Sequence, residues 1–157
     1  MKKYYITTAI PYVNGNPHLG HVMDYILADV LRRYMIMRGA DVRFQAGTDE
    51  HGSKIFKKAG ESGLPVQEYV DQNAKRFQDF IRELGVEYTD YVRTTDPDHM
   101  RRCQEIWQKL SDHIYKDRYE GWYCEPCESF WTDTQVGEEH ICPDCGRSVK
   151  KAAEPAY

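Results

Sequence analysis

The stretch YYITTAIPYVNGNPHLGH, residues 4–21, joins a predicted strand to a predicted helix through a turn-rich loop. Residues 4–10 are rich in aromatic and β-branched side chains and stop at Pro11, which is typical of a strand ended by a breaker. From Leu19 to Gly39 apolar residues recur every three or four positions, which indicates an amphipathic helix. A strand followed by a long helix is typical of the beginning of an α/β sheet.

Strands and helices continue to alternate along the chain. A short strand over 42–46 follows the first helix, and a strand–helix–strand unit of this length predicts parallel pairing. A second amphipathic stripe over 66–84 predicts another helix. Asp96 and Pro97 then combine a cap residue with a first-turn proline, and they start a third stripe that continues to Ile114.

The composition restricts the class of protein. With 157 residues, of which 41% are hydrophobic and 29% charged, the sequence is typical of a globular protein with one domain, or one core and a small added module. The net charge of −4 excludes an overall basic field for nucleic acid. No apolar run is long enough to span a bilayer, and no export signal is visible. We therefore expect a cytoplasmic protein whose cysteines are thiols or metal ligands.

Helical periodicity is lost near residue 116, where two CxxC pairs follow with fourteen residues between them. The four cysteines are Cys124, Cys127, Cys142 and Cys145. Two such pairs can place four thiolates around one tetrahedral ion, which predicts a closed, structural Zn²⁺ site. A fifth cysteine, Cys103, lies on the third apolar stripe and is expected in the core. We divide the chain into 1–115 and 116–157.

Two histidines, His18 and His21, stand three residues apart where the loop becomes the first helix. The start of a helix that follows a sheet strand favours phosphate, because backbone N–H groups and the helix dipole point toward it. Gly20, between them, removes a side chain that would keep a base or ribose away from the backbone. The residues alone leave two interpretations open: a nucleotide cradle with two imidazole donors, or a helix cap with incidental histidines.

Three stretches carry a resemblance to a known family: AIPYVNGNPHLGH at 9–21, GTDEHGSKI at 47–55 and GWYCEPCESFW at 121–131. In this order they resemble the bacterial-type methionyl-tRNA synthetases, which are class I aminoacyl-tRNA synthetases, with HLGH as the HIGH-type signature. The resemblance covers essentially the whole chain. It implies an α/β fold: a Rossmann-like, parallel-sheet nucleotide-binding half over 1–115, and a connective-insertion segment with a zinc knuckle over 116–157, together an incomplete domain.

The resemblance also implies an activity: ATP, as its Mg²⁺ complex, activates methionine to methionyl-adenylate, and the methionyl group then passes to tRNA(Met). The catalytic residues implied by motif match are His18 and His21, which hold phosphates as charge moves to the leaving pyrophosphate. The implied ATP-binding residues are Tyr12, Asn14, Gly15, His18, Gly20 and His21. The implied amino-acid-binding residues are Ile10, Tyr12, Asp49 and His51. Of these, Asp49 would hold the substrate ammonium.

Two parts of the family pattern are not found in these residues: a lysine-rich KMSKS loop and a helical anticodon-binding domain. We therefore expect the amino-terminal part of a synthetase. Two other classes of protein also fit single motifs. One is a nucleotidyltransferase of the HxGH type that acts on another acid, and the other is a zinc-ribbon binding module without catalysis. The sequence does not predict an oligomeric state.

Overall fold

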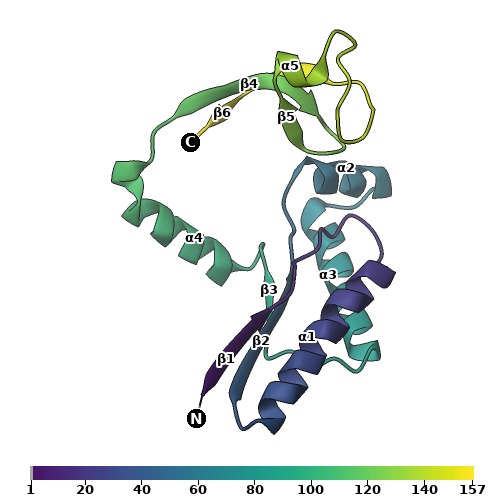
Figure 1. The fold of residues 1–157 in the computed structure, drawn as a ribbon, viewed down its shortest axis with the longest axis vertical. Helices are drawn as coiled ribbons and strands as arrows, with labels where there is room; N and C mark the ends of the chain where they lie inside the picture. Colours follow the sequence, from purple (N-terminus) through teal and green to yellow (C-terminus); the bar gives the residue numbers. More distant parts are fainter. Residues whose placement is uncertain (1) are drawn as a thin grey trace. The chain divides into compact units, whose positions relative to one another are not determined.

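A computed structural model describes residues 2–157 and divides the chain into two compact units, Met1–Gln104 and Glu105–Tyr157. Strands and helices alternate in the first unit, and the second contains a sheet of antiparallel strands (Figure 1). The division lies before the predicted boundary between 115 and 116, and the assignment of two functional domains stays a prediction. None of the helices in the described part of the chain has the length and apolarity needed to cross a membrane.

The first unit contains a parallel sheet of three strands, which are β1 (Lys3–Thr7), β2 (Asp41–Thr48) and β3 (Asp90–Arg93). The strand order is β1-β2-β3, so the longest of the three strands, β2, lies in the centre. Both β1 and β3 pair with β2 in parallel. The helix α1 (Leu19–Met37) connects β1 to β2, so the predicted strand–helix–strand unit with parallel pairing is confirmed.

Three further helices complete this part of the chain: α2 (Ser53–Ser62), α3 (Val66–Glu83) and α4 (Pro97–Lys109). The predicted second helix is confirmed as α3, and the predicted helix start at Pro97 is confirmed as that of α4. The predicted extent of the third helix to Ile114 was wrong, because a separate 3₁₀ turn over Ser111–His113 follows α4. The sequence analysis did not predict α2 or β3.

Two strand boundaries also differ from the sequence prediction. The first strand was expected over 4–10 but ends at Thr7, and the second was expected over 42–46 but extends over Asp41–Thr48. The first difference has a local reason. Parallel contact with the second strand continues at Tyr12, where an isolated bridge to Asp49 forms, so the intervening residues act as a bulge.

Two buried clusters hold the first unit together. Ile6 and Phe44 of the sheet pack with Tyr25 of α1 and Ile81 of α3 in the larger cluster. The smaller cluster contains Val13, whose side chain is completely buried among residues of α2 and α3. Burying a Val side chain contributes about 1.5–3 kcal/mol, so Val13 anchors the turn-rich loop between β1 and α1.

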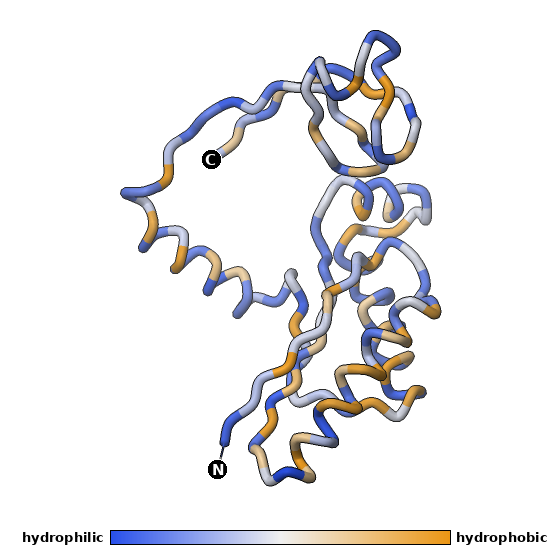
Figure 2. Tube along the Cα trace, in the orientation of Figure 1, coloured by the Kyte–Doolittle hydropathy of each residue, from blue (hydrophilic) through white to orange (hydrophobic). Residues whose placement is uncertain are grey.

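The apolar stripe that predicted α1 does not face the sheet. The buried residues of this helix are Tyr25, Ala28 and Asp29, whereas Leu19 and Met37 at its two ends are 82% and 85% exposed. Figure 2 shows the hydrophobic character of this helix along its length. The helix is therefore amphipathic in sequence, but Tyr25 and Ala28, which lie outside that stripe, pack against the sheet.

The second unit is built around an antiparallel sheet of β4 (Asp117–Cys124), β5 (Ser129–Trp131) and β6 (Lys150–Ala156). The strand order is β5-β4-β6, and a short helix, α5 (Asp133–Val136), follows β5. The buried residues are few: Cys124, Val136, Cys142 and Val149. Two of these four are cysteines, so the core of this unit is also the place where the CxxC pairs meet.

Cys103 was expected in the core, and this prediction was wrong. The cysteine lies on α4, none of whose described residues is buried, and its thiol is 3.4 Å from Nε2 of His99 on the same helix. The apolar stripe of α4 is exposed, with Trp107 51% accessible. A helical stripe predicts a helix and one apolar face, but it does not show what covers that face.

Candidate functional site

The loop before α1 and the loop after β2 meet beyond the carboxyl ends of the first two strands. The backbone N–H of Asp49 donates to the carbonyl of Pro11 at 2.9 Å, and the N–H of Val13 donates to the carbonyl of Asp49 at 3.3 Å. The structure thus brings together Tyr12 and Asp49, two of the predicted amino-acid-binding residues. Tyr12 and Ile10 are each 41% exposed, and Asp49 is half-buried, so all three are accessible to a small molecule.

His18 and His21 together form the cap of α1. The backbone N–H of His18 donates to Nδ1 of His21 at 3.1 Å, and the N–H of Gly20 donates to Nδ1 of His18 at 3.2 Å. These bonds form a reciprocal capping box, a pattern in which two unpaired backbone donors are satisfied by side chains. Because each Nδ1 accepts a hydrogen bond from a backbone N–H, the neutral ring carries its own proton on Nε2. Each imidazole is therefore left with one N–H donor.

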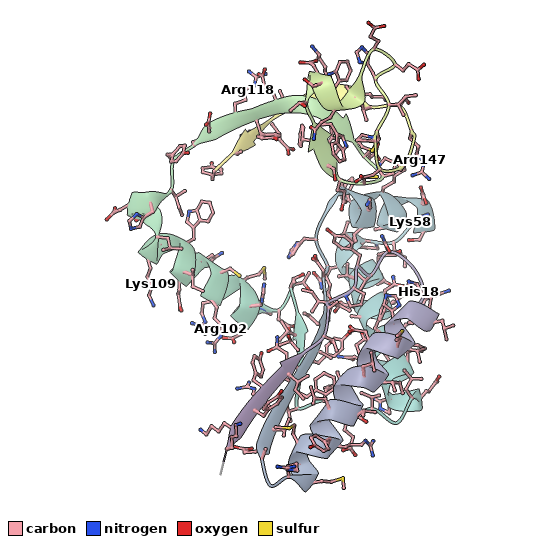
Figure 3. The ribbon with its side chains drawn as sticks, in the orientation of Figure 1. His18, Lys58, Arg102, Lys109, Arg118 and Arg147 are labelled. Atoms are coloured by element: carbon pink, nitrogen blue, oxygen red, sulfur yellow. The ribbon has the colours of Figure 1, made fainter. Side chains whose placement is uncertain are left out.

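The rings of the two histidines are stacked, with centroids 3.8 Å apart. The ring of His21 also lies edge-on to Phe77 of α3, at 5.2 Å between centroids. Burial, followed by repulsion from His18, lowers the pKa of His21 below the usual 6.5, although Asp24 acts in the opposite direction. Both the capping geometry and the electrostatics therefore favour neutral His21. Figure 3 shows His18 at the first turn of the helix.

Two glycines lie close to neighbouring atoms. A Cβ on Gly20 would lie 3.1 Å from Cε1 and Nδ1 of the His18 ring, so this glycine makes room for the capping imidazole. A Cβ on Gly47 would lie 2.3 Å from the carbonyl oxygen of Val92 and 3.0 Å from Cγ2 of Ile10. Gly47 therefore allows β2 and β3 to approach closely beside Ile10. The sequence analysis did not single out Gly47.

The remaining predicted site residues lie in the same two loops. Asn14 is half-buried and Gly15 is exposed, both in the turn-rich loop before α1. His51 is exposed, and its Nε2 lies 3.1 Å from the carbonyl oxygen of Thr94. The structure thus places every predicted ATP-binding and amino-acid-binding residue on one of two adjoining loops or, for Gly20 and His21, in the first turn of α1.

One buried acidic residue beside these loops was missed. Glu50 is 2% exposed, and its carboxylate accepts hydrogen bonds from Nε and Nη2 of Arg93 at 2.8 and 2.9 Å. The hydroxyls of Thr48 and Thr95 donate to the same carboxylate. Glu50 could have been noticed as a charged residue directly after a buried strand. No sequence pattern identifies Arg93 as its partner, because the two residues are 43 positions apart.

The four predicted zinc ligands converge in the second unit. Their Sγ atoms all lie within 4.8 Å of one another, and the thiols of Cys124 and Cys145 are 3.6 Å apart. Those of Cys127 and Cys142 are 3.9 Å apart. Zn–S bonds of about 2.3 Å in a tetrahedron require S···S distances of about 3.8 Å. The donor set and spacing therefore fit one tetrahedral zinc ion.

The thiols influence one another strongly. Hydrogen bonding with Cys145, together with burial, raises the pKa of Cys127 to about 12. The backbone N–H of Arg147 donates to Cys145 and is the main cause that lowers its pKa to about 7. A backbone N–H directed at a thiolate is also the usual support for a cysteine that binds a metal ion.

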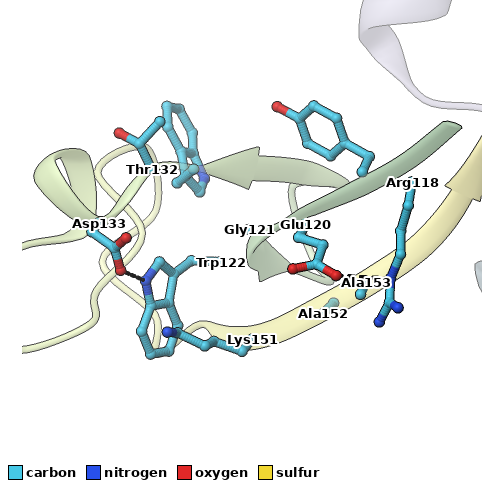
Figure 4. A pocket seen from close by; sticks show the side chains of 11 residues that line it. Arg118, Glu120, Gly121, Trp122, Thr132, Asp133, Lys151, Ala152 and Ala153 are labelled. Atoms are coloured by element: carbon cyan, nitrogen blue, oxygen red, sulfur yellow. Dashed lines mark hydrogen bonds and ion pairs between the residues drawn. The ribbon is translucent and has the colours of Figure 1, made fainter.

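The second unit also contains a groove of about 510 Å³, which is lined by residues of β4, β5 and β6 (Figure 4). Nε1 of Trp122 donates to the carboxylate of Asp133 at 2.8 Å, and Nζ of Lys151 lies 5.2 Å from the centre of the same indole. His140 stacks on Trp122 with ring centroids 3.9 Å apart. None of the residues predicted as site residues lines this groove.

Comparison with known proteins identifies relatives for nearly the whole chain. A family model described as tRNA synthetases class I (M) matches residues 4–155. The methionine–tRNA ligases of Clostridium perfringens and Clostridium tetani are 47% and 45% identical to this chain, each over 99% of it. A solved structure of Mycobacterium tuberculosis methionyl-tRNA synthetase in complex with methionyl-adenylate matches with a TM-score of 0.89 at 36% identity.

These matches cover only part of each relative. The chain spans about a quarter of the length of the curated relatives, 24% in both Clostridium proteins, and 31% of the solved M. tuberculosis chain. The match to that solved chain covers 99% of the present one, which confirms the expected Rossmann-like α/β fold. With a family model that matches almost end to end and relatives above 40% identity, the chain belongs to the class I (M) tRNA synthetases, the methionyl-tRNA synthetase family.

Proposed function

We propose that these residues form part of a methionine–tRNA ligase, in which they bind ATP and methionine for the first step of the reaction. In that step a carboxylate oxygen of methionine attacks the α-phosphorus of ATP. The bond to the β-phosphate breaks, pyrophosphate leaves, and methionyl-adenylate forms. In the second step a hydroxyl of the terminal adenosine of tRNA(Met) attacks the carbonyl carbon, and AMP leaves. The family favours this function over an HxGH nucleotidyltransferase or a zinc-ribbon module without catalysis.

The observation that carries the ATP proposal is the hydrogen bonding of the two histidine rings. With both Nδ1 atoms bonded to backbone N–H groups, His18 and His21 each offer an Nε2–H donor at the first turn of α1. The helix dipole favours negative charge at the same place. We assign these donors to phosphate oxygens, where they stabilise the charge that accumulates on the leaving pyrophosphate. Tyr12, Asn14, Gly15 and Gly20 form the rest of the ATP-binding loop in this proposal.

The methionine site is proposed on the adjoining backbone. Asp49 accepts the substrate ammonium, a charge-assisted hydrogen bond that is about twice as strong as a neutral one. Ile10 and Tyr12, each with an exposed apolar surface, contact the thioether side chain. His51 completes the wall beyond Asp49. No enzyme nucleophile is needed, because the protein contributes position and electrostatic stabilisation.

Zn²⁺ is proposed as a structural ion in the second unit, held by Cys124, Cys127, Cys142 and Cys145. Four thiolate ligands leave no open coordination position, so the ion stabilises the fold and supplies no Lewis-acid chemistry. ATP is proposed to enter as its Mg²⁺ complex, and the cytoplasm is the proposed location of the reaction.

The experiment uses a hybrid ligase in which residues 1–157 replace the matching segment of the full-length C. perfringens enzyme. Methionine-dependent exchange of pyrophosphate into ATP should occur, and Asp49→Ala should raise the KM for methionine by more than tenfold. The KM for ATP should change far less in this variant. A hybrid that is folded but shows no methionine-dependent exchange, or exchanges equally well with another amino acid, would contradict the proposal.

A further inference from the structure

We propose that Glu50 and Arg93 are positioning residues for the amino-acid site: their buried ion pair fixes the short loop that carries Asp49 and His51. The inference rests on the proposed function, because it assigns the methionine contacts to that loop. Neither Glu50 nor Arg93 is proposed to touch methionine or ATP. Their effect is exerted through the backbone on both sides of Glu50.

The first support is the completeness of the contacts around the Glu50 carboxylate. The Glu50 side chain is fully shielded from solvent, and Arg93 donates to both of its oxygens. The Thr48 hydroxyl donates at 2.7 Å, and the Thr95 hydroxyl donates to the other oxygen. A buried carboxylate is costly unless charge and hydrogen bonds are satisfied, and here both are. The carboxylate therefore has one well-defined position.

The second support is a set of hydrogen bonds that also fix the residues on both sides of Glu50. The backbone N–H of Glu50 donates to the Thr94 hydroxyl at 2.8 Å, and the ring of His51 contacts the Thr94 carbonyl at 3.1 Å. On the other side, the backbone of Asp49 bonds to Pro11 and Val13. Asp49 is therefore held between the loop that precedes α1 and the anchor at Glu50. A displacement of about 1 Å in a site of this kind is enough to lower the reaction rate about 10²-fold.

The third support is a second anchor at the outer end of the pair. Nη2 of Arg93 also donates to Asp71 of α3 at 2.5 Å, and the pair with Arg93 is the main cause that lowers the pKa of Asp71. The guanidinium of Arg93 is thus held from two directions, by a buried and by a half-exposed carboxylate. This series of contacts leads from α3 through Arg93 and Glu50 to the loop, and it includes no residue that is proposed to touch a ligand.

The test is Glu50→Gln in the hybrid ligase. Glutamine keeps the shape of the side chain, but it removes the charge and places an NH₂ group against a donor from Arg93 or a threonine. We expect the KM for methionine in pyrophosphate exchange to rise about tenfold or more, as the loop loses its fixed position. The KM for ATP should stay within about twofold of the unchanged hybrid, because the histidine cap of α1 makes no contact with this pair.

The matched control is Asp29→Asn. Asp29 is also buried, at 6% exposure, and it also pairs with two guanidinium groups, those of Arg32 and Arg33. Its contacts do not include the two site loops. Both substitutions should therefore lower thermal stability, but only Glu50→Gln should separate the two KM values. Equal changes in both KM values for Glu50→Gln and Asp29→Asn would overturn the inference, because they would indicate a stability effect alone.

A second variant keeps the inference testable if Glu50→Gln does not fold. Asp71→Asn loosens Arg93 without leaving a buried charge unpaired, and it should raise the KM for methionine about two- to threefold with little change for ATP. No change in the KM for methionine in a folded Asp71→Asn variant would contradict the inference. Failure of the proposed function has a different signature, because then Asp49→Ala itself would leave the KM for methionine unchanged.

Discussion

Nδ1 of His21 accepts the backbone N–H of His18 at 3.1 Å, so the same imidazole that is proposed to meet a phosphate also caps the helix that carries it. Glutamate and glutamine are the usual residues at this position of a capping box. The two roles of His21 can therefore be separated by substitution. The cap requires only an acceptor at this position, whereas phosphate binding requires a donor.

His21→Glu is the substitution that separates them. Its carboxylate can accept the His18 N–H and interacts favourably with the helix dipole, so the start of α1 should remain as protected from hydrogen exchange as before. Its negative charge should repel ATP, and pyrophosphate exchange by the hybrid ligase should fall about 10³-fold or more. His21→Ala should lose both functions, with about 1 kcal/mol less stability at the helix start. If the His21→Glu variant kept its pyrophosphate-exchange activity, the proposed phosphate-binding role of His21 would be contradicted.

The lowered pKa of His21 predicts a pH dependence of the helix start. A histidine whose pKa is lower in the folded than in the unfolded state contributes its full stability above the unfolded value of 6.5, and this contribution is lost as the pH falls below 6.5. Protonation at Nδ1 also breaks the bond to His18. Protection of the first turn of α1, corrected for intrinsic exchange rates, should therefore be constant above about pH 7 and decrease toward pH 5.

The control for this prediction is His21→Gln, which keeps an acceptor for the cap but cannot titrate. Its protection should therefore decrease less between pH 7 and pH 5 than that of the unchanged hybrid. A variant with the same pH profile as the unchanged hybrid would show that His21 is not the titrating group.

Gly47→Ala should destabilise the sheet beside the site. The new Cβ would lie 2.3 Å from the Val92 carbonyl, a backbone atom that cannot move without shifting β3. Overpacking of this kind costs about 1–3 kcal/mol, which should appear as faster hydrogen exchange in β2 and β3. Gly60→Ala is the matched control: its Cβ meets nothing within 4 Å, and a helical glycine replaced by alanine gains about 0.5–1 kcal/mol. If β2 and β3 were equally protected from hydrogen exchange in the two variants, the prediction would be contradicted.

The sequence predicts those features that depend on neighbouring residues. The strand before Pro11, the helix from Leu19 and the two CxxC pairs are each defined within a few positions, and the structure contains all three. By contrast, α2 has only Ile55 and Ala59 buried, which is too weak a periodicity to recognise, and β3 has only four residues. Short elements of this kind form because a neighbouring strand or helix completes them.

Two further features depend on contacts between distant positions. The pairing of Glu50 with Arg93 links residues 43 positions apart, and no local pattern reports it. The side of α1 that meets the sheet is also decided by tertiary packing, because the helix buries Tyr25 and Ala28 and leaves Leu19 and Met37 of its apolar stripe exposed. The site loops were found from their motifs, and the groups that support them were found only in the structure.

The last prediction concerns the metal. In the hybrid ligase, the double variant Cys124→Ser, Cys142→Ser should contain about one zinc ion per chain fewer than the unchanged protein, because it removes one ligand from each CxxC pair. The second unit should lose protection from hydrogen exchange, since the buried residues there are only two valines besides these cysteines, while β1, β2 and α1 should keep theirs. Cys103→Ser, at an exposed thiol outside the cluster, is the matched control and should leave the zinc content unchanged. Elemental analysis decides the question: an undiminished zinc content in the double variant would mean that the four thiols are not the ligands.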